Sequence, residues 1–488
     1  MKKKLYCILA FVLVVSLLAS CGAGGAMDND SGAYYGDYYY DGESYLDIIE
    51  GGIKYPNENP ETTFSLKVDT ASYTNVKRYI EAGNLPPEDA VRTEELINYF
   101  NYDEQVVIHD DVPFGIYTEI GPSPFDPDKL MAFIRVKTLE IDKSEMPNSN
   151  LVFLIDSSGS MDSYDKLPLL KEAFMLLVEE LGAGDRVSIV TYAGSSRVVL
   201  SGAGGNDKAE IIQAINSLDA GGSTAGADGI YTAYELAKEY YISGGNNRVI
   251  LATDGDFNVG ISDVDRLSDF IFEKRGTGVY LSVLGFGTGN IRDDIMETLA
   301  KDGNGNYSYI DSVETAKKVL VDEMGANLFV VAEDVKAQLA FNADTVASYR
   351  LIGYENRMMD NDDFSDDSKD AGEIGAGTDI VVMVEFELKS DRGDFFEVRL
   401  RYKDPGKDES RELTLPVGGE KLLSKNTSDF GFACAVAMYG HLLRGSEYLG
   451  DVTYNDIMEM AESNYGRDNG SYRRDFVNML DDGRRLFY

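Results

Sequence analysis

Side chains that carry oxygen gather in three short segments of the sequence. Asp156, Ser158 and Ser160 alternate along Asp-Ser-Ser-Gly-Ser, Thr224 ends Gly-Gly-Ser-Thr, and Asp254 stands in Thr-Asp-Gly. A spacing of i, i+2, i+4 on a turn can aim the first three side chains at one point. Hydroxyl and carboxylate oxygens are hard ligands, which select Mg²⁺, Mn²⁺ or Ca²⁺ over zinc or copper. We therefore expect a divalent-cation site, with Mg²⁺ as the first choice of metal.

Catalytic chemistry is harder to build from these residues. The two serines do not indicate a serine hydrolase, because no Gly-x-Ser-x-Gly elbow surrounds them. The chain has only two histidines, His109 and His441, which leaves little room for a histidine-based zinc site or for repeated acid–base catalysis. We therefore expect no enzymatic activity.

Buried strands must position the candidate site. Leu151–Ile155 and Val249–Ala252 are unbroken apolar runs, and each runs directly into one of the oxygen-rich segments. Continuous apolar strands are buried on both faces, as in a parallel sheet. Helical patterns such as the one from Leu167 to Leu181 lie between them. The pattern predicts a doubly wound, mostly parallel, Rossmann-like α/β domain over residues 148–325, with ligands bound at the carboxyl ends of its strands.

These motifs resemble the metal-ion-dependent adhesion site (MIDAS) of the von Willebrand factor type A (VWA) domain, over about residues 148–325. Asp156, Ser158 and Ser160 match its Asp-x-Ser-x-Ser motif, Thr224 its loop threonine and Asp254 its Thr-Asp-Gly aspartate. The resemblance implies that Ser158, Ser160 and often Thr224 contact the metal, while Asp156 and Asp254 act through water. A cation held mostly by neutral hydroxyls keeps positive charge and a replaceable water, which a carboxylate from a protein partner can displace.

The flanking regions show a different pattern. Residues 61–147 predict an N-terminal flanking domain of helices followed by two strands, residues 326–420 a β-rich domain, and residues 421–488 a C-terminal helical segment. Because strands precede and follow the α/β domain, we expect it to be inserted into one discontinuous antiparallel β-sandwich. The segments 63–73 and 349–357 resemble the flanking domains of a bacterial family of A-domain lipoproteins.

The N-terminus has the form of a targeting signal. Three lysines at positions 2–4 precede the apolar stretch Leu5–Leu18, which is shorter than the roughly 20 residues of a membrane-spanning helix. The stretch ends in Leu-Ala-Ser-Cys, which resembles a bacterial lipobox. We expect residues 1–20 to be a signal peptide, Cys21 to be lipidated, and residues 21–60 to form a flexible tether. The protein would then be extracytoplasmic and lipid-anchored to a bacterial membrane.

Composition narrows the class of partner. The 488 residues carry 45 Lys and Arg against 84 Asp and Glu, a formal charge of −39, which argues against a nucleic-acid ligand. We expect a surface lipoprotein that binds a protein partner through its metal. Two alternatives stay open: an envelope scaffold whose metal site binds its own flanking domain, and a chelatase-like or enzymatic component.

Overall fold

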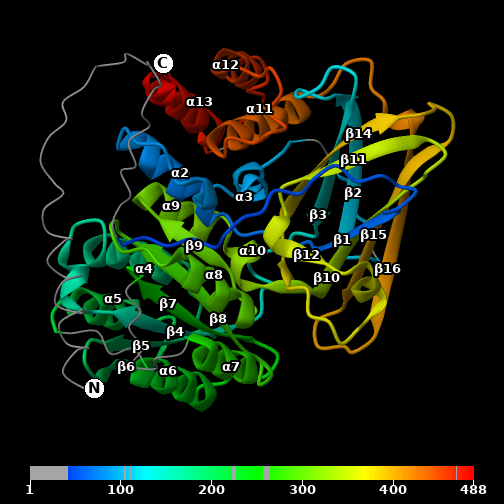
Figure 1. Cartoon of the computed structure of the whole chain (residues 1–488). Helices are drawn as coiled ribbons and strands as arrows, with labels where there is room; N and C mark the ends of the chain where they lie inside the picture. The colour runs from blue at the N-terminus through cyan, green and yellow to red at the C-terminus, as the bar shows by residue number, and fades with distance from the viewer. Residues whose placement is uncertain are drawn as a thin grey trace, which may run out of the picture. The chain divides into compact units, whose positions relative to one another are not determined.

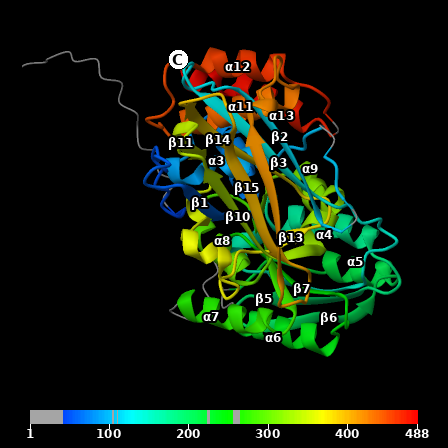
Figure 2. The same ribbon diagram turned by 90° about the vertical axis from the view of Figure 1, so that its right-hand side faces the viewer.

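The structure is a computed structural model that describes residues 42–103, 106–109, 111–222, 227–255, 264–468 and 470–487. The expected signal peptide, the expected lipidation site Cys21 and the candidate ligand Thr224 lie outside these residues. The described chain forms an α/β domain, a β-sandwich and a layer of helices (Figures 1 and 2). Among these residues, no helix combines the length and the apolar composition needed to cross a membrane.

The α/β domain contains a sheet in the order β6-β5-β4-β7-β8-β9. Every neighbouring pair is parallel except β5 and β6. The expected doubly wound, mostly parallel sheet is therefore confirmed, although the edge strands β6 and β9 were not foreseen. The strands are β4 (Ser149–Asp156), β5 (Arg186–Tyr192), β6 (Ser196–Gly204), β7 (Asn246–Thr253), β8 (Val279–Phe286) and β9 (Tyr307–Ile310).

Helices cover both faces of this sheet, which explains the continuous apolar strands. Phe153 of β4 packs in a core with α4 and α5, whereas Leu154, its neighbour, packs with α6, α7 and α8 on the opposite face. The helices are α4 (Leu167–Glu180), α5 (Lys208–Asn216), α6 (Ala227–Glu239), α7 (Val264–Arg275), α8 (Asp293–Asp302), α9 (Val313–Lys317) and α10 (Met324–Leu328), with a π-helical turn η3 (Lys318–Asp322).

The β-sandwich is built from strands on both sides of the α/β domain in the sequence. Its sheets have the orders β12-β1-β10-β15-β16 and β11-β14-β3-β2. Phe133 of β3 lies opposite Met383 of β14, so the expected discontinuous sandwich is confirmed. The strands are β1 (Glu61–Ser65), β2 (Phe114–Pro122), β3 (Leu130–Thr138), β10 (Val330–Phe341), β11 (Val346–Ile352), β12 (Met358–Met359), β13 (Ile374–Gly375), β14 (Asp379–Leu388), β15 (Asp394–Lys403) and β16 (Ser410–Gly418).

The N- and C-terminal helices likewise share one core. The rings of Phe100, Phe432 and Phe476 lie 5.0–5.6 Å apart. The helices are α2 (Ala71–Glu81), α3 (Thr93–Asn98), α11 (Ser428–Leu443), α12 (Tyr454–Ser463) and α13 (Tyr472–Gly483). Short 3₁₀ turns are η1 (Glu88–Ala90), η2 (Gly159–Asp162), η4 (Glu355–Arg357), η5 (Asn361–Ser365), η6 (Gly419–Lys421) and η7 (Arg484–Leu486). The sequence predicts the flanks as consecutive domains. They instead form the β-sandwich and the layer of helices, and each of these contains residues from both sides of the α/β domain in the sequence.

Residues 42–60, which we call the strap, lie against the folded body. The Ser44 amide donates to the Ile291 carbonyl at 2.9 Å, and Lys54 and Tyr349 exchange backbone hydrogen bonds of 2.8 and 2.9 Å. Glu43 is nearly buried and pairs with Arg78 at 2.7 Å. The expectation of a flexible tether over residues 21–60 is therefore wrong for residues 42–60, because their polar groups are anchored.

Candidate metal site

The candidate site lies at the carboxyl ends of β4 and β7, two parallel neighbours. Ile155 is in register with Ala252, so Asp156 and the Thr253-Asp254 pair leave the sheet at the same edge. The chain runs from β4 to β5 on one side, while β7 lies on the other side. Open α/β sheets bind ligands at such a point, where the strand order reverses.

The loop after β4 brings three of the predicted residues together. Asp156 is fully buried, and its Oδ1 accepts the Ser158 amide at 2.8 Å. The hydroxyls of Ser158 and Ser160 lie 2.9 Å apart, and Ser160 is exposed. Thr253 donates its hydroxyl to Asp156 Oδ2 at 3.4 Å. The loop therefore pairs the buried carboxylate of Asp156 and the buried hydroxyl of Ser158 with the exposed residue Ser160.

Asp254 joins this group from β7. It is fully buried, and the Ser160 hydroxyl hydrogen-bonds to its carboxylate. Its Oδ2 also lies 2.9 Å from Lys166 Nζ, which contacts Asn290 Oδ1 at 3.2 Å. The structure thus brings Asp156, Ser158, Ser160 and Asp254 together, as expected from the sequence.

Lys166 and Asn290 are residues that the sequence interpretation missed. Lys166 directly precedes α4, where a lysine is an ordinary surface residue. Asn290 stands in Gly-Thr-Gly-Asn directly after the apolar run of β8. That position, at the carboxyl end of a third neighbouring strand, is the signal that could have identified it.

The two carboxylates differ in their electrostatic surroundings. Burial raises the pKa of Asp156 to about 6, although hydrogen bonds from Ser158 oppose the shift, and the nearby Asp254 adds to it. Burial would also raise the pKa of Asp254, but hydrogen bonds from Ser160 and Lys166 hold it below its usual value. Asp254 therefore carries a negative charge matched by an ammonium, whereas hydrogen bonds from Ser158 and Thr253 stabilise the negative charge of Asp156.

Backbone hydrogen bonds tie the second loop of the site to the first. The Gly159 amide donates to the Gly222 carbonyl at 3.2 Å, and the Gly221 amide donates to the Ser157 carbonyl at 2.8 Å. Gly222 has a φ of +90°, a conformation that favours glycine. Gly221 and Gly222, the last described residues of this second loop, therefore lie beside the Asp156 loop. Thr224 follows them in the sequence and lies outside the described residues.

The donor set fits a hard cation. Within the described residues, no three His, Cys, Asp or Glu side chains gather in a way that could hold a metal. Four of the predicted ligand residues are among those described. These four offer two carboxylates and two hydroxyls, and none of them offers a nitrogen or sulfur ligand. Such a set fits Mg²⁺, Mn²⁺ or Ca²⁺.

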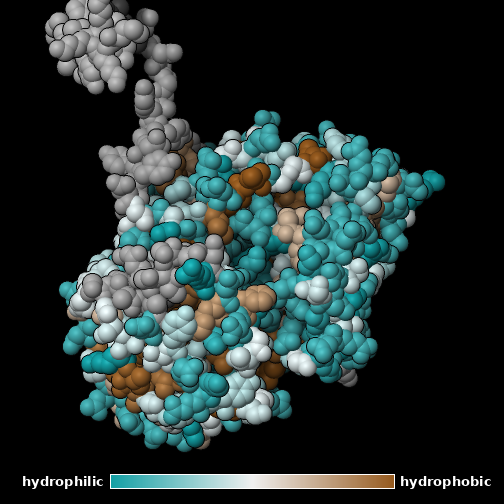
Figure 3. All heavy atoms as spheres, turned by 60° about the horizontal axis from the view of Figure 1, so that its bottom comes forward, coloured by the Kyte–Doolittle hydropathy of each residue, from teal (hydrophilic) through white to brown (hydrophobic). Residues whose placement is uncertain are grey.

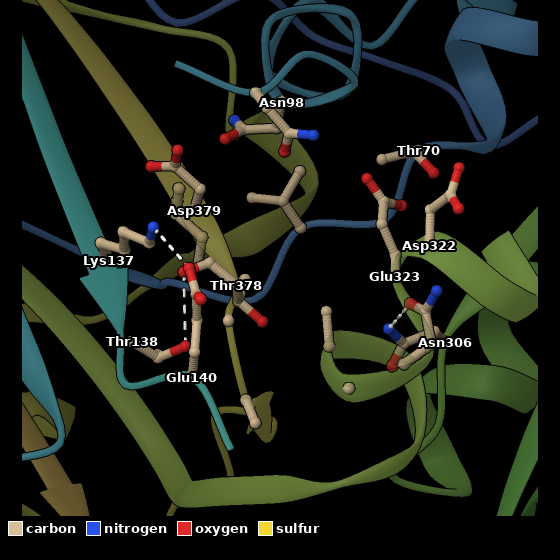
Figure 4. Close-up of a pocket in the computed structure, with 18 of the residues that line it drawn as sticks. Thr70, Asn98, Lys137, Thr138, Glu140, Asn306, Asp322, Glu323, Thr378 and Asp379 are labelled. Atoms are coloured by element: carbon tan, nitrogen blue, oxygen red, sulfur yellow. Dashed lines mark hydrogen bonds and ion pairs between the residues drawn. The ribbon is translucent and has the colours of Figure 1, made fainter. Parts of the chain in front are cut away.

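A separate cleft of about 800 Å³ is lined by β3, β9, β14 and the turn before α10 (Figure 4). Lys137 pairs with Glu140 at 2.8 Å, and Arg135 pairs with Asp379 at 2.6 Å. Each of these two basic side chains of the cleft therefore forms an ion pair with a carboxylate that also lines the cleft. We assign this cleft no function.

Family comparisons match the chain in three parts. The model "von Willebrand factor type A domain" matches residues 150–322, "von Willebrand factor" matches residues 39–132, and "Uncharacterized protein YfbK, C-terminal" matches residues 326–486. The YfbK protein of Escherichia coli K12 is 41% identical over 463 residues, which cover 90% of this chain and 80% of that protein. Human inter-alpha-trypsin inhibitor heavy chain H3 is 28% identical over 164 residues, which cover 32% of this chain and 18% of that protein.

Solved structures with similar folds include a von Willebrand factor type A protein from Catenulispora acidiphila. It is 17% identical with a TM-score of 0.44, over 78% of this chain and 91% of that chain. Proximal thread matrix protein 1 of the mussel byssus, solved with a zinc-occupied MIDAS motif, is 22% identical with a TM-score of 0.30. That match covers 38% of this chain and 46% of that chain.

Proposed function

Since the chain belongs to the family of the Escherichia coli protein YfbK and carries a von Willebrand factor type A domain, we propose that it binds a protein partner through a divalent cation. The observation that carries this proposal is the convergence of Asp156, Ser158, Ser160 and Asp254 at one sheet edge. The proposed role is binding and not catalysis.

The site would hold Mg²⁺, with Mn²⁺ or Ca²⁺ as chemically similar substitutes. Ser158, Ser160 and Thr224 would supply hydroxyl ligands, and Asp156 and Asp254 would act through water. The metal would supply an electrophilic centre for an anionic group. Neutral hydroxyls leave much of its charge uncompensated, so a carboxylate of the partner is the matching ligand.

The acidic composition is compatible with such a partner. A formal charge of −39 repels acidic surfaces at long range, but salt screens that repulsion beyond about 8 Å. The face drawn in Figure 3 is largely hydrophilic, with apolar residues in separate areas. Tyr164, in the loop after Ser160, is 87% exposed and offers an apolar contact next to the site. Local recognition at the cation can therefore outweigh the overall charge.

We place the protein outside the cytoplasm, anchored to a bacterial membrane through lipidated Cys21. This part of the proposal rests on the sequence of residues 1–21. Mass spectrometry of the mature N-terminus from native membranes tests it. An acylated peptide beginning at Cys21 supports the anchor, and an unmodified Met1 peptide refutes it.

The metal site is tested by isothermal titration with Mg²⁺. The Asp156→Asn and Asp254→Asn double variant keeps the side-chain volumes and should lose binding. Asp162→Ala, which removes an exposed acid from the same loop, is the control and should bind normally. Absence of Mg²⁺, Mn²⁺ and Ca²⁺ binding in the wild type, or normal binding in the double variant, refutes the proposal.

The scaffold alternative, in which the metal holds a flanking segment of the same chain, requires a flanking carboxylate that can bind the metal. Glu43 of the strap reaches the edge of the site, where its Oε1 accepts the Gly289 amide at 2.9 Å. Its carboxylate also binds Arg78 and Tyr79, at 2.7 and 2.6 Å. Because these partners already occupy it, this carboxylate fits the role of an anchor and not that of a metal ligand.

A further inference from the structure

We propose that Lys166 sets the balance between the affinity of the site for its metal and the affinity of the loaded site for a partner carboxylate. Its ammonium gives the metal-loaded site a net positive charge, which weakens cation binding and strengthens capture of a partner carboxylate. This inference rests on the proposed function, because it requires a divalent cation beside Asp156 and Asp254.

The Lys166 side chain is held in a defined place. It is only 7% exposed, and its Nζ lies 2.9 Å from Asp254 Oδ2 and 3.2 Å from Asn290 Oδ1. Its stem passes over Gly287, where a Cβ atom would come within 2.3 Å of Lys166 Cε. The close approach requires the absence of a side chain at residue 287. The ammonium is therefore a fixed part of the site.

The strap helps to hold the loop that supports this ammonium. Glu43 accepts the Gly289 amide at 2.9 Å, and the Ser44 amide donates to the Ile291 carbonyl at 2.9 Å. These two contacts lie on either side of Asn290. Asn290, which accepts a hydrogen bond from Lys166 and keeps it turned toward Asp254, is thus anchored on both sides.

The charges of the site show what Lys166 changes. Asp156, Asp254 and Lys166 together carry a charge of −1 when the carboxylates are ionised, so a bound divalent cation leaves +1. Without the ammonium, the same loaded site would be neutral. Two cations that share one buried carboxylate repel each other, so the ammonium lowers the affinity for the metal. The remaining positive charge favours an anion in the open coordination position.

The test measures two affinities with defined probes. Mn²⁺ binding is followed by isothermal titration, and acetate binding to the Mn²⁺-loaded protein by the fall in water-proton relaxation as acetate displaces bound water. Lys166→Gln removes the charge while keeping a hydrogen-bond donor, and Lys166→Met removes both. Lys171→Met, on α4 and away from the site, is the matched control, because Lys171 hydrogen-bonds to the Asn216 carbonyl.

We expect both Lys166 variants to bind Mn²⁺ at least roughly tenfold more tightly than the wild type, and the loaded variants to bind acetate more weakly. A purely structural role predicts the opposite sign for the metal, because a disordered site binds it less tightly. Unchanged or weaker Mn²⁺ binding by folded Lys166→Gln, with normal wild-type binding, overturns this inference alone. Absence of Mn²⁺, Mg²⁺ and Ca²⁺ binding in the wild type overturns the proposed function as well.

Discussion

The Nη1 atom of Arg92 lies 2.6 Å from Oδ2 of Asp293, and both side chains are buried. Arg92 directly precedes α3 in the N-terminal flank, whereas Asp293 is the first residue of α8 in the α/β domain. Arg92 also pairs with Glu95 at 2.6 Å. This buried ion pair therefore joins the inserted α/β domain to the N-terminal flank. Its α/β partner, Asp293, lies three residues after Asn290 in the sequence.

Replacing Arg92 should destabilise the protein strongly. Arg92→Met leaves buried carboxylates without their cation, and loss of one partner of a buried pair typically costs about 3–5 kcal/mol. Chemical denaturation measures the change in the free energy of unfolding. Lys317→Met is the control, because Lys317 pairs with Asp322 at 2.6 Å on the exposed surface. There we expect a loss below about 1 kcal/mol. Equal losses for the two variants would contradict a special role for the buried pair.

His441 should make the protein sensitive to mild acid. Burial, with the charges of Arg350 and Arg444, lowers the pKa of His441 to about 3. Its Nε2 accepts from Arg350 Nη1 at 2.9 Å and lies 3.5 Å from Glu50, while Nδ1 donates to the Ala437 carbonyl at 3.0 Å.

In the unfolded chain the pKa is near 6.5, so below that pH the unfolded state takes up a proton that the folded state excludes. Stability is therefore lost as pH falls, by about 2 kcal/mol at pH 5 from this residue. His441→Gln removes that contribution, which urea denaturation at pH 7 and pH 5 measures. The variant should lose less stability than the wild type between these two pH values. Identical losses would show that His441 does not titrate in this way.

The strap should protect the loop beside the metal site. Glu43→Ala removes the acceptor of the Gly289 amide together with a partner of Arg78. We expect faster amide hydrogen exchange at residues 287–292, with little change in the β-sandwich, because the lost contacts are local. Asp47→Ala, at an exposed position of the strap, is the control. Unchanged exchange in Glu43→Ala would show that the anchor does not restrain the loop.

Gly287 should be intolerant of a side chain for two separable reasons. Gly287 and Gly244 both have positive φ, +73° and +71°. A Cβ at Gly287 would collide with Lys166, whereas a Cβ at Gly244 would collide with nothing. Gly244→Ala should therefore cost only backbone strain, about 1 kcal/mol. Gly287→Ala should cost a further 1–3 kcal/mol or so from overpacking. Thermal unfolding compares the two variants, and equal melting temperatures would argue against close packing of Lys166 on Gly287.

The α/β domain was predictable because its signals are local. Burial on both faces made Leu151–Ile155 and Val249–Ala252 continuous apolar runs, and the oxygen-rich segments directly follow them. Strand β6 was missed because it is an edge strand without a buried apolar run, and β9 because it has only four residues. The insertion into a discontinuous sandwich followed from strands on both sides of this domain, and the pairing of β3 with β14 confirms it.

The errors concern contacts between distant parts of the chain. The strap is rich in glycine and polar residues, so its composition indicated a tether, yet Glu43 contacts Arg78 and Gly289, which lie far along the sequence. Lys166 was overlooked for the same reason, since its partner Asp254 lies 88 residues away. Local patterns identify elements, whereas buried charge pairs appear only once the chain is folded.

An anomalous difference map from crystals soaked in Mn²⁺ tests directly whether the candidate site binds a divalent cation. We expect a peak in contact with the hydroxyl oxygens of Ser158 and Ser160, beside Asp156 and Asp254. A peak elsewhere, or no peak at this sheet edge in a crystal where the loop is open to solvent, would contradict this expectation.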